Sequence, residues 1–267
     1  MLELFSYPPI LQGFIVLMAS GLSFPIAGVY LLRMNLLPLR FMLMHGALLG
    51  GAIALAFQLD PFLTTMLINL VLVWFMMQAS RSLKADAGNI SIFIMVAAIG
   101  LAFTFISVFN VQAKDTLSLL WGSIFTISPL QTVGFVFVAL FVVLFQLLKR
   151  NQLKAVFFDS SVAYSSGINE SGIHYFVILL TALIVAVAMK LIGALLIDAV
   201  IILPALISSL HTKSMKSMIV WACIWGGVFS FSGFFVAYWL KIPTSSAIAL
   251  IATLIFLIIF IQKRLKK

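Results

Sequence analysis

The chain has 267 residues, of which 64% are hydrophobic and only 9% are charged, and its mean hydropathy is +1.24. These values exclude a soluble globular domain and indicate an integral membrane protein. The single cysteine, Cys223, excludes a disulfide framework and any multi-cysteine metal cluster. The net charge of +9 does not predict nucleic-acid binding, because the basic residues gather at the ends of apolar segments.

The first apolar stretch is predicted to be a retained span, because residues 1–10 carry Glu3 and have neither a basic region nor a small-residue cleavage site. A hydrocarbon core of about 30 Å requires about 20 helical residues. Segmentation on that basis predicts nine spans, at residues 10–32, 41–58, 62–80, 90–110, 130–148, 173–189, 191–210, 217–239 and 245–262. We therefore expect an all-α, polytopic membrane protein with about nine transmembrane helices in one domain, residues 1–267.

Residues 173–210 would form a helix about 57 Å long if they were continuous, which is too long for one span. They are predicted to fold as a hairpin that turns near Lys190.

Lysine and arginine residues set the predicted orientation, since they concentrate in cytoplasmic loops. Three of the sixteen, Lys114, Lys190 and Lys241, lie on one side. The other thirteen lie in the alternate set of loops: Arg33, Arg40, Arg81, Lys84, Lys149, Arg150, Lys154, Lys213, Lys216, Lys263, Arg264, Lys266 and Lys267. The amino terminus is therefore predicted outside, and the carboxyl terminus inside. A polar segment, residues 149–172, is also predicted inside.

Residues 116–128 are apolar but too short to cross the membrane, and Pro129 follows them. Two interpretations stay open on the predicted outer side. The segment is either a re-entrant helix that forms an outer gate, or a surface helix anchored by Trp121.

Small residues recur at packing distance in two spans, a set that comprises Gly46, Gly50, Gly226, Ser230 and Gly233. In lipid, close backbone approach favours helix association, so these positions predict packing contacts. Pro25 in the first span and Pro204 in the seventh interrupt the helical hydrogen bonds. They produce either simple kinks or the broken helices that line transport routes.

Two ionisable residues stand in apolar surroundings. Asp198 lies in the middle of LLIDAVIILP, where a lone carboxylate would cost several kcal/mol, so a partner, a cavity, a cation or a proton must compensate it. His45 lies about 6 Å inside the second span. An imidazole suits zinc, manganese or iron, and a carboxylate suits the harder of these ions. Both residues are candidates for the transport path; the alternatives are a structural histidine and an aspartate paired with a serine or the backbone.

The chain carries no phosphate-binding loop, HExxH or GxSxG motif. We therefore expect no enzymatic activity and no bound cofactor, and any ATP must be hydrolysed by another subunit.

The polar segment KRNQLKAVFFDSSVAYSSGINESG is predicted to hold a short helix. Asp159 and Ser160 are suited to cap it, and Gly167 is suited to end it. Four residues are expected to pack this helix: Phe157, Phe158, Val162 and Tyr164. The segment is either a lever gripped by a partner or an amphipathic surface helix.

The order of FFDSSVAYSSGIN, KLIGALLIDAVIILPALISSL and AYWLKIPTSSAIAL resembles the permease subunit of the ABC-3 family of zinc, manganese and iron ABC transporters. Gly193, Pro204 and Pro243 fall on family positions, and His45 falls on the histidine of an aspartate-x-x-x-histidine segment. The resemblance implies an ATPase-coupling role for Phe158, Asp159, Ala163, Tyr164, Gly167 and Ile168.

The chain departs from the family pattern at three places. Phe41 stands where the family has an acidic residue, Leu49 replaces a proline, and Asp198 stands at a position where small or hydroxyl residues are common. One hypothesis is that Asp198 supplies the missing carboxylate from a facing helix.

The resemblance implies an importer in a bacterial or archaeal plasma membrane. Two copies of the chain would enclose a path for the metal ion. An ATPase dimer would bind ATP beneath them, and an extracellular binding protein would deliver the substrate. Two alternatives stay open: a permease for a metal chelate such as a siderophore, haem or cobalamin, and a secondary transporter that uses Asp198 as a proton or sodium site.

Overall fold

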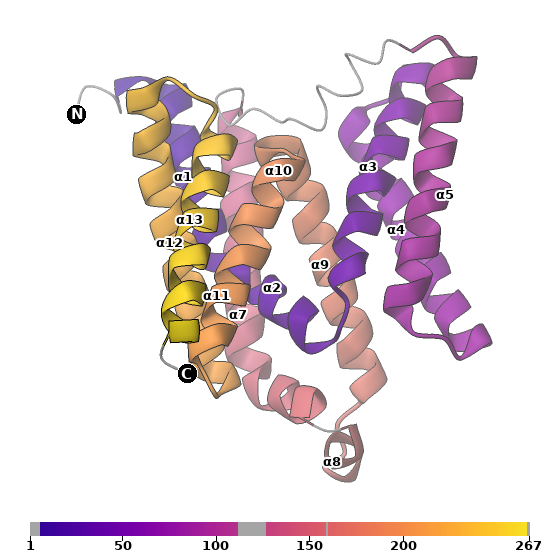
Figure 1. Cartoon of the computed structure of the whole chain (residues 1–267). Helices are drawn as coiled ribbons and strands as arrows, with labels where there is room; N and C mark the ends of the chain where they lie inside the picture. The colour runs from indigo at the N-terminus through magenta and orange to yellow at the C-terminus, as the bar shows by residue number, and fades with distance from the viewer. Residues whose placement is uncertain (1–5, 112–126, 159, 266–267) are drawn as a thin grey trace. The chain divides into compact units, whose positions relative to one another are not determined.

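The computed structural model describes residues 6–111, 127–158 and 160–265, and every regular element in these ranges is a helix (Figure 1). In chain order they are α1 (Pro8–Ser23), α2 (Pro25–Arg33), α3 (Leu37–Phe57), α4 (Pro61–Leu83), α5 (Ala87–Val108), α7 (Pro129–Phe158), α8 (Ser160–Ser165), α9 (Glu170–Ile192), α10 (Ala194–Ile197), the π-helix η2 (Asp198–Ile202), α11 (Leu203–His211), α12 (Met215–Leu240) and α13 (Thr244–Leu265). The predicted helical fold class is confirmed. The predicted segment 116–128 falls outside the described residues, apart from its last two.

Eight of the described helices are long and apolar enough to cross a membrane, with α1 and α2 together counted as one. They correspond to eight of the nine predicted spans. The exception is the predicted span 191–210, where the structure has three short helical pieces instead of one long helix. The reason is local: Gly193 has a φ of +82°, which only glycine adopts readily, and Pro204 has no N–H to continue the helical bonds. The break lies at Gly193, three residues beyond the predicted turn at Lys190.

The chain forms two compact units, and each is described by itself. The larger unit comprises Met1–Leu32, Ser123–Ile173 and Leu195–Lys267, and the smaller comprises Arg33–Gly122 and His174–Ala194. The prediction of one domain over the whole chain stays a prediction.

In the smaller unit, α3 packs closely against both α4 and α5. A Cβ atom on Gly46 would lie 2.6 Å from Cδ1 of Leu72, and one on Gly50 would lie 2.6 Å from the Cα of Thr65. Both glycines therefore serve the predicted close approach of helices. The amino terminus of α4 is capped by Asp60, whose side chain accepts a hydrogen bond from the N–H of Leu63 at 2.8 Å.

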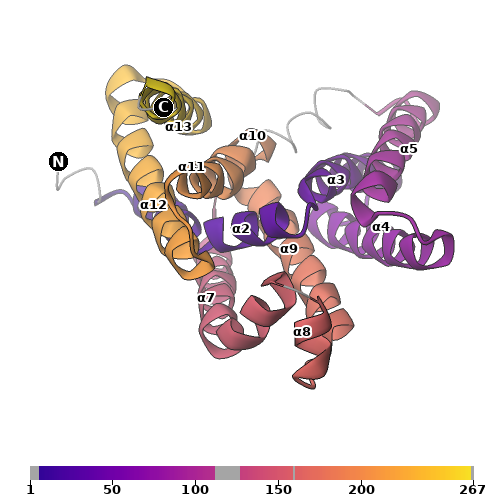
Figure 2. The ribbon, with the colours of Figure 1, turned by 60° about the horizontal axis from the view of Figure 1, so that its bottom comes forward.

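In the larger unit, α12 lies between α1, α11 and α13 (Figure 2). A Cβ atom on Gly226 would lie 2.6 Å from Cγ of Pro25, and one on Gly233 would lie 2.9 Å from the Cα of Ile248. Helix α1 also contacts α7. The predicted break at Pro25 is present, since α1 ends at Ser23 and α2 begins at Pro25 after the buried Phe24. This unit carries the break at Pro25 and the apolar segment from Asp198 to His211 that contains Pro204.

Candidate functional site

Asp198 opens the π-helix η2, a wider helical turn in which the N–H of Leu203 bonds to the carbonyl of Asp198 five residues earlier. The side chain of Asp198 is half-buried, while the next four residues are buried. Because Pro204 offers no N–H, the carbonyls of the preceding turn have fewer donors than in a regular helix. Single π-turns inside α-helices occur frequently at functional sites. The structure thus places the predicted carboxylate on irregular backbone within an apolar segment.

Helix α2 packs directly on this irregular turn through Gly28. A Cβ atom on Gly28 would lie 2.9 Å from the carbonyl carbon of Ile201, with the carbonyl oxygen closer still, and 3.1 Å from the Cβ of Ala205. Only a residue without a side chain allows α2 to approach the backbone of η2 in this way. Movement of α2 along its axis would therefore press on the turn that begins at Asp198.

Tyr30, two residues beyond Gly28, links α2 to α7. Its hydroxyl group donates a hydrogen bond to Oε1 of Gln146, and its ring lies 5.5 Å from the ring of Phe157, centroid to centroid. Tyr30 is 1% exposed. No local pattern predicts this contact, since Tyr30 and Gln146 are 116 residues apart.

His45 lies in α3 of the smaller unit and is half-buried. Its Nδ1 atom is 2.8 Å from the carbonyl oxygen of Phe41. A carbonyl oxygen only accepts hydrogen bonds, so Nδ1 is the donor in this contact, and in the neutral imidazole Nε2 then carries the lone pair. A hydrogen bond from one ring nitrogen orients an imidazole whose other nitrogen binds a metal ion.

His45 and Asp198 belong to different units, so each is described separately, and the hypothesis that Asp198 completes a site with His45 stays a prediction. Within the ranges that the structure describes, no group of three or more His, Cys, Asp or Glu residues is placed to hold a metal ion.

The predicted coupling segment begins inside α7. This helix has 30 residues and is about 45 Å long, which exceeds a hydrocarbon core of about 30 Å by about half. The part of the segment from Lys149 to Phe158 is therefore helical and continues α7, which changes direction near its end, before α8 (Figures 1 and 2). Phe158 is its last residue, and Asp159 falls outside the described residues.

Helix α8 ends at Ser165, and Gly167, two residues further on, closes it as the sequence predicts, with a φ of +70°. The N–H of Gly167 bonds to the carbonyl of Tyr164, and the N–H of Ile168 bonds to the carbonyl of Ala163, each at 3.0 Å. This pair of bonds is the Schellman arrangement that closes helix ends. A second cap follows, since Oδ1 of Asn169 accepts a hydrogen bond from the N–H of Gly172 at 2.9 Å and starts α9.

The side chains in and after α8 differ in burial. Ala163 is fully buried, Ile168 is half-buried, and Tyr164 is 83% exposed. The expectation that Tyr164 packs within the chain is wrong for the residues that the structure describes, because its side chain extends away from the short helix α8. Phe157 does pack, on the ring of Tyr30.

A further contact that sequence reasoning missed lies in the smaller unit. The guanidinium group of Arg81 donates a hydrogen bond from Nε to the hydroxyl of Tyr175 and lies 4.2 Å from the centroid of the Tyr175 ring. It ties the end of α4 to α9, the helix that follows the α8 segment in the chain.

Comparison with known proteins identifies the family. The model of the ABC 3 transport family matches residues 6–263, nearly the whole chain. The chain belongs to the ABC 3 transport family. The resemblance found in the sequence is thereby confirmed, and the chain is a multi-pass protein of the cell membrane and a transport subunit. Membership also argues against a secondary transporter.

Two relatives in this family extend over nearly the same length. The chain is 30% identical over 268 residues to the "Probable iron transport system membrane protein" of Haemophilus influenzae, covering 98% of this chain and 92% of that protein. It is 25% identical over 261 residues to the "Manganese transport system membrane protein MntC" of Listeria monocytogenes, covering 97% and 92%.

A solved structure has the same fold. It is titled "PsaBC from Streptococcus pneumoniae in complex with Fab", and it matches with a TM-score of 0.81 at 23% identity. The match covers 97% of this chain and 93% of that one.

Proposed function

We propose that this chain is the permease subunit of an ATP-driven importer for divalent transition-metal ions, namely zinc, manganese or iron. The proposal includes two copies of the chain around the path, a separate ATPase that binds and hydrolyses ATP, and an extracellular binding protein. Family membership and the iron and manganese systems named for two relatives support the class of substrate. The chain itself binds no cofactor in this proposal.

The observation that carries the metal-ion proposal is the hydrogen bond between Nδ1 of His45 and the backbone carbonyl of Phe41. With Nδ1 bonded to the carbonyl of Phe41, Nε2 offers its lone pair without any proton rearrangement. Neutral imidazole binds zinc, manganese and iron well. His45 therefore serves as a ligand for the ion in transit. The backbone carbonyl of Phe41 orients the ring, in the way that outer groups orient metal ligands.

Asp198 is the second transport-path residue of the proposal. It sits where an apolar helix is interrupted, and such interruptions in transporters accompany substrate and ion sites. A carboxylate at this depth lowers the barrier for a divalent cation, because the charges of ion and carboxylate offset each other outside water. Asp198 acts on the cation by charge, and His45 acts by coordination.

The segment from α7 through α8 is the proposed site of ATPase contact. Its exposed Tyr164 and its doubly capped turn at Gly167 give a partner a rigid projection to grip. Ala163 and Ile168, two of the six predicted coupling residues, stabilise the end of α8 through the hydrogen bond between them. In this proposal they do not contact the partner. Asp159, at the join between α7 and α8, is retained in the proposal from the family resemblance.

A continuous set of contacts within the larger unit supports the transmission of movement from the site of ATPase contact to Asp198. It runs from Phe157 in α7 to Tyr30 in α2, and from Gly28 in α2 to the turn that holds Ile201 and begins at Asp198. Each step is a close contact between helices, so a displacement at the end of α7 reaches the carboxylate. In this mechanism ATP closure moves α7, and α2 transfers the motion to η2.

Uptake by the complete complex in proteoliposomes tests the proposal. Purification of the tagged chain from its host should bring down a phosphate-loop ATPase. ATP should then drive accumulation of radioactive zinc, manganese or iron, and competition with the free metal ion should exceed competition with its chelates. Preferential competition by a siderophore, haem or cobalamin would instead assign the chelate function, which the absence of an acidic residue at Phe41 favours. Accumulation that follows an ion gradient without ATP would reject both.

A further inference from the structure

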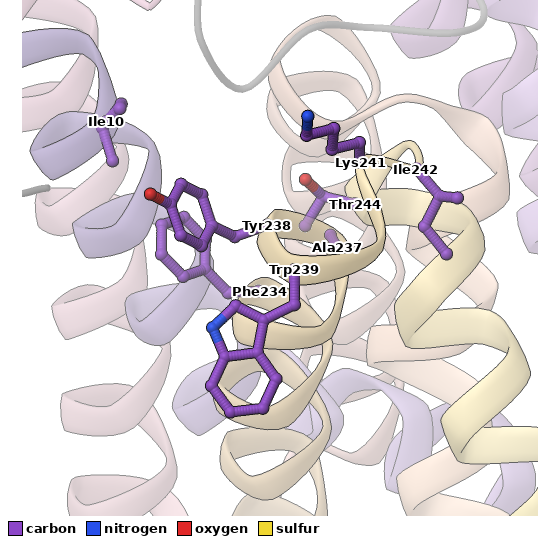
Figure 3. A pocket seen from close by; sticks show the side chains of 8 residues that line it. All are labelled: Ile10, Phe234, Ala237, Tyr238, Trp239, Lys241, Ile242 and Thr244. Atoms are coloured by element: carbon purple, nitrogen blue, oxygen red, sulfur yellow. The ribbon is translucent and has the colours of Figure 1, made fainter. Parts of the chain in front are cut away.

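A cleft in the larger unit lies at the end of α12 and the start of α13, and no residue of η2 or α8 lines it. Its volume is about 530 Å³, and Figure 3 shows the side chains around it. It is lined by Ile10, Phe234, Ala237, Tyr238, Trp239, Lys241, Ile242 and Thr244. The volume falls within the range of small-molecule sites, about 300–1,000 Å³. These residues come from α1, α12, α13 and the connection between α12 and α13, which all belong to one unit.

The wall of the cleft is apolar in its depth. Phe234 and Ala237 are 3% and 5% exposed, and Phe14 of α1 supports Phe234 with an edge-to-face ring contact at 5.0 Å. Ile10 closes the side toward α1 (Figure 3). These apolar side chains can contact the hydrocarbon part of a ligand, but they cannot bind an ion.

The mouth of the cleft carries amphipathic and charged groups. Tyr238 and Trp239 are 54% and 70% exposed, and Lys241 is exposed beside them. Figure 3 shows the Lys241 ammonium and the Thr244 hydroxyl at the upper edge, with the Trp239 ring below and the Tyr238 ring directed toward Ile10. Of the eight residues that line the cleft, Lys241 is the one with a formal charge.

The backbone fixes where Lys241 stands. Helix α12 ends at Leu240, Lys241 adopts a φ of +54°, and its N–H bonds to the carbonyl of Ala237. Helix α12 has 26 residues and is about 39 Å long, about 9 Å more than a hydrocarbon core of about 30 Å. Tryptophan and tyrosine at such helix ends lie at the level of the lipid headgroups, and lysine extends to the phosphates.

We propose that this cleft binds one anionic phospholipid of the surrounding bilayer. The lipid phosphate pairs with the ammonium group of Lys241, the glycerol region lies against Trp239 and Tyr238, and the upper part of an acyl chain enters between Ile10 and Phe234. A lipid fits both halves of the cleft. A free phosphate ion would use only Lys241, and an apolar ligand would leave the charge without a partner. This inference depends on the chain being a membrane protein and not on the proposed substrate.

The contribution of Lys241 to the free energy of lipid binding can be estimated. One lysine near an anionic lipid surface contributes about 1 kcal/mol, which corresponds to about a fivefold change in affinity. Removal of this charge should therefore lower the preference for anionic lipid about fivefold, while contact with the aromatic wall keeps weak binding of any phospholipid.

Native mass spectrometry of the full-length chain tests the proposal, after removal of lipid in mild detergent and addition of phosphatidylglycerol or phosphatidylcholine. The wild-type chain should retain one phosphatidylglycerol in preference to phosphatidylcholine. Lys241→Gln should lower this retention about fivefold, and Lys241→Arg should keep it. Lys213→Gln, an exposed lysine outside the cleft, is the matched control and should behave as wild type.

Thermal unfolding gives a second measurement, because a ligand that binds the folded state raises Tm. Phosphatidylglycerol should raise the Tm of the wild-type chain more than that of Lys241→Gln, and excess inorganic phosphate should change neither. Equal retention of both lipids, equal losses in Lys241→Gln and Lys213→Gln, or displacement of the lipid by inorganic phosphate would each overturn the proposal.

Discussion

The hydroxyl group of Tyr30 in α2 donates a hydrogen bond to the side-chain carbonyl of Gln146 in α7. Both groups lie in spans, where water is scarce and a lost partner is not replaced readily. Tyr30 also stacks near Phe157, at the end of the helix that precedes α8. This residue therefore joins the long helix that leaves the membrane to the helix that supports η2.

Tyr30→Phe should weaken this connection without removing the ring. We expect a loss of about 1 kcal/mol in stability, because the side-chain oxygen of the half-buried Gln146 loses its donor. Transport per ATP hydrolysed should also fall, since α2 then follows α7 less closely. Tyr7→Phe is the matched control, because Tyr7 is 67% exposed before α1. Identical Tm and coupling ratio in the two variants would contradict the role of Tyr30.

Gly28→Ala tests the contact between α2 and η2. The new Cβ atom would lie 2.9 Å from the carbonyl carbon of Ile201, and backbone cannot move aside as a flexible side chain does. Overpacking of this kind destabilises by about 1–3 kcal/mol, so Tm and uptake should both fall. In Gly100→Ala nothing lies within 4 Å of the new atom, and the higher helix propensity of alanine should hold or raise Tm. A Gly28→Ala chain that is as stable as Gly100→Ala would show that α2 is not seated on η2.

Asp198→Asn should lower metal uptake much more than Ser230→Ala does. Loss of the negative charge removes about 1.4 kcal/mol or more of attraction for a divalent ion, which is about tenfold in rate or affinity. The Ser230 hydroxyl is buried between α12 and α1, where the structure gives it no hydrogen-bond partner, so its removal should be nearly neutral. Initial uptake rates against metal concentration measure both. Wild-type rates in Asp198→Asn would remove this residue from the path.

Gly167 allows a test of the lever that separates backbone conformation from side-chain size. Nothing lies within 4 Å of a Cβ atom at this position, so Gly167→Ala acts only through the φ of +70°, at about 1–2 kcal/mol. We expect substrate-driven ATP hydrolysis to uncouple from uptake in Gly167→Ala. Gly167→Asn should retain coupling, because asparagine tolerates this backbone conformation. Uncoupling in both variants, or in neither, would refute the backbone explanation.

Much of the fold follows from the sequence because a span is a matter of length and hydropathy. Eight predicted spans correspond to long helices, and the breaks at Pro25 and near Gly193 follow from residues visible in the chain. The sequence misplaced the end of α7, because hydropathy falls at Lys149 whereas the helix continues to Phe158. Lysine, arginine, glutamine and leucine are good helix formers in water as well, so polarity ended the predicted span but not the helix.

The site was predictable only in part. His45 and Asp198 stood out as ionisable residues among apolar ones, and the turn at Gly167 followed from glycine. The π-helix could not be predicted from the sequence. It lies between Pro204 and the contact of Gly28 with Ile201, and that contact joins residues that are distant in the chain. Tyr30 was missed because its partners, Gln146 and Phe157, are distant in sequence and nothing local marks them.

The most direct test of the account is the accessibility of Tyr164 in the assembled transporter. A Tyr164→Cys variant should react with a membrane-impermeant maleimide, since this side chain is 83% exposed. It should do so from the cytoplasmic side alone, since the basic residues predict that residues 149–172 lie inside. The bound ATPase should protect it, and a short thiol cross-linker should join it to that subunit. Labelling from the external side, or unchanged labelling with the ATPase bound, would contradict the claim that the α7–α8 projection receives the force that drives transport.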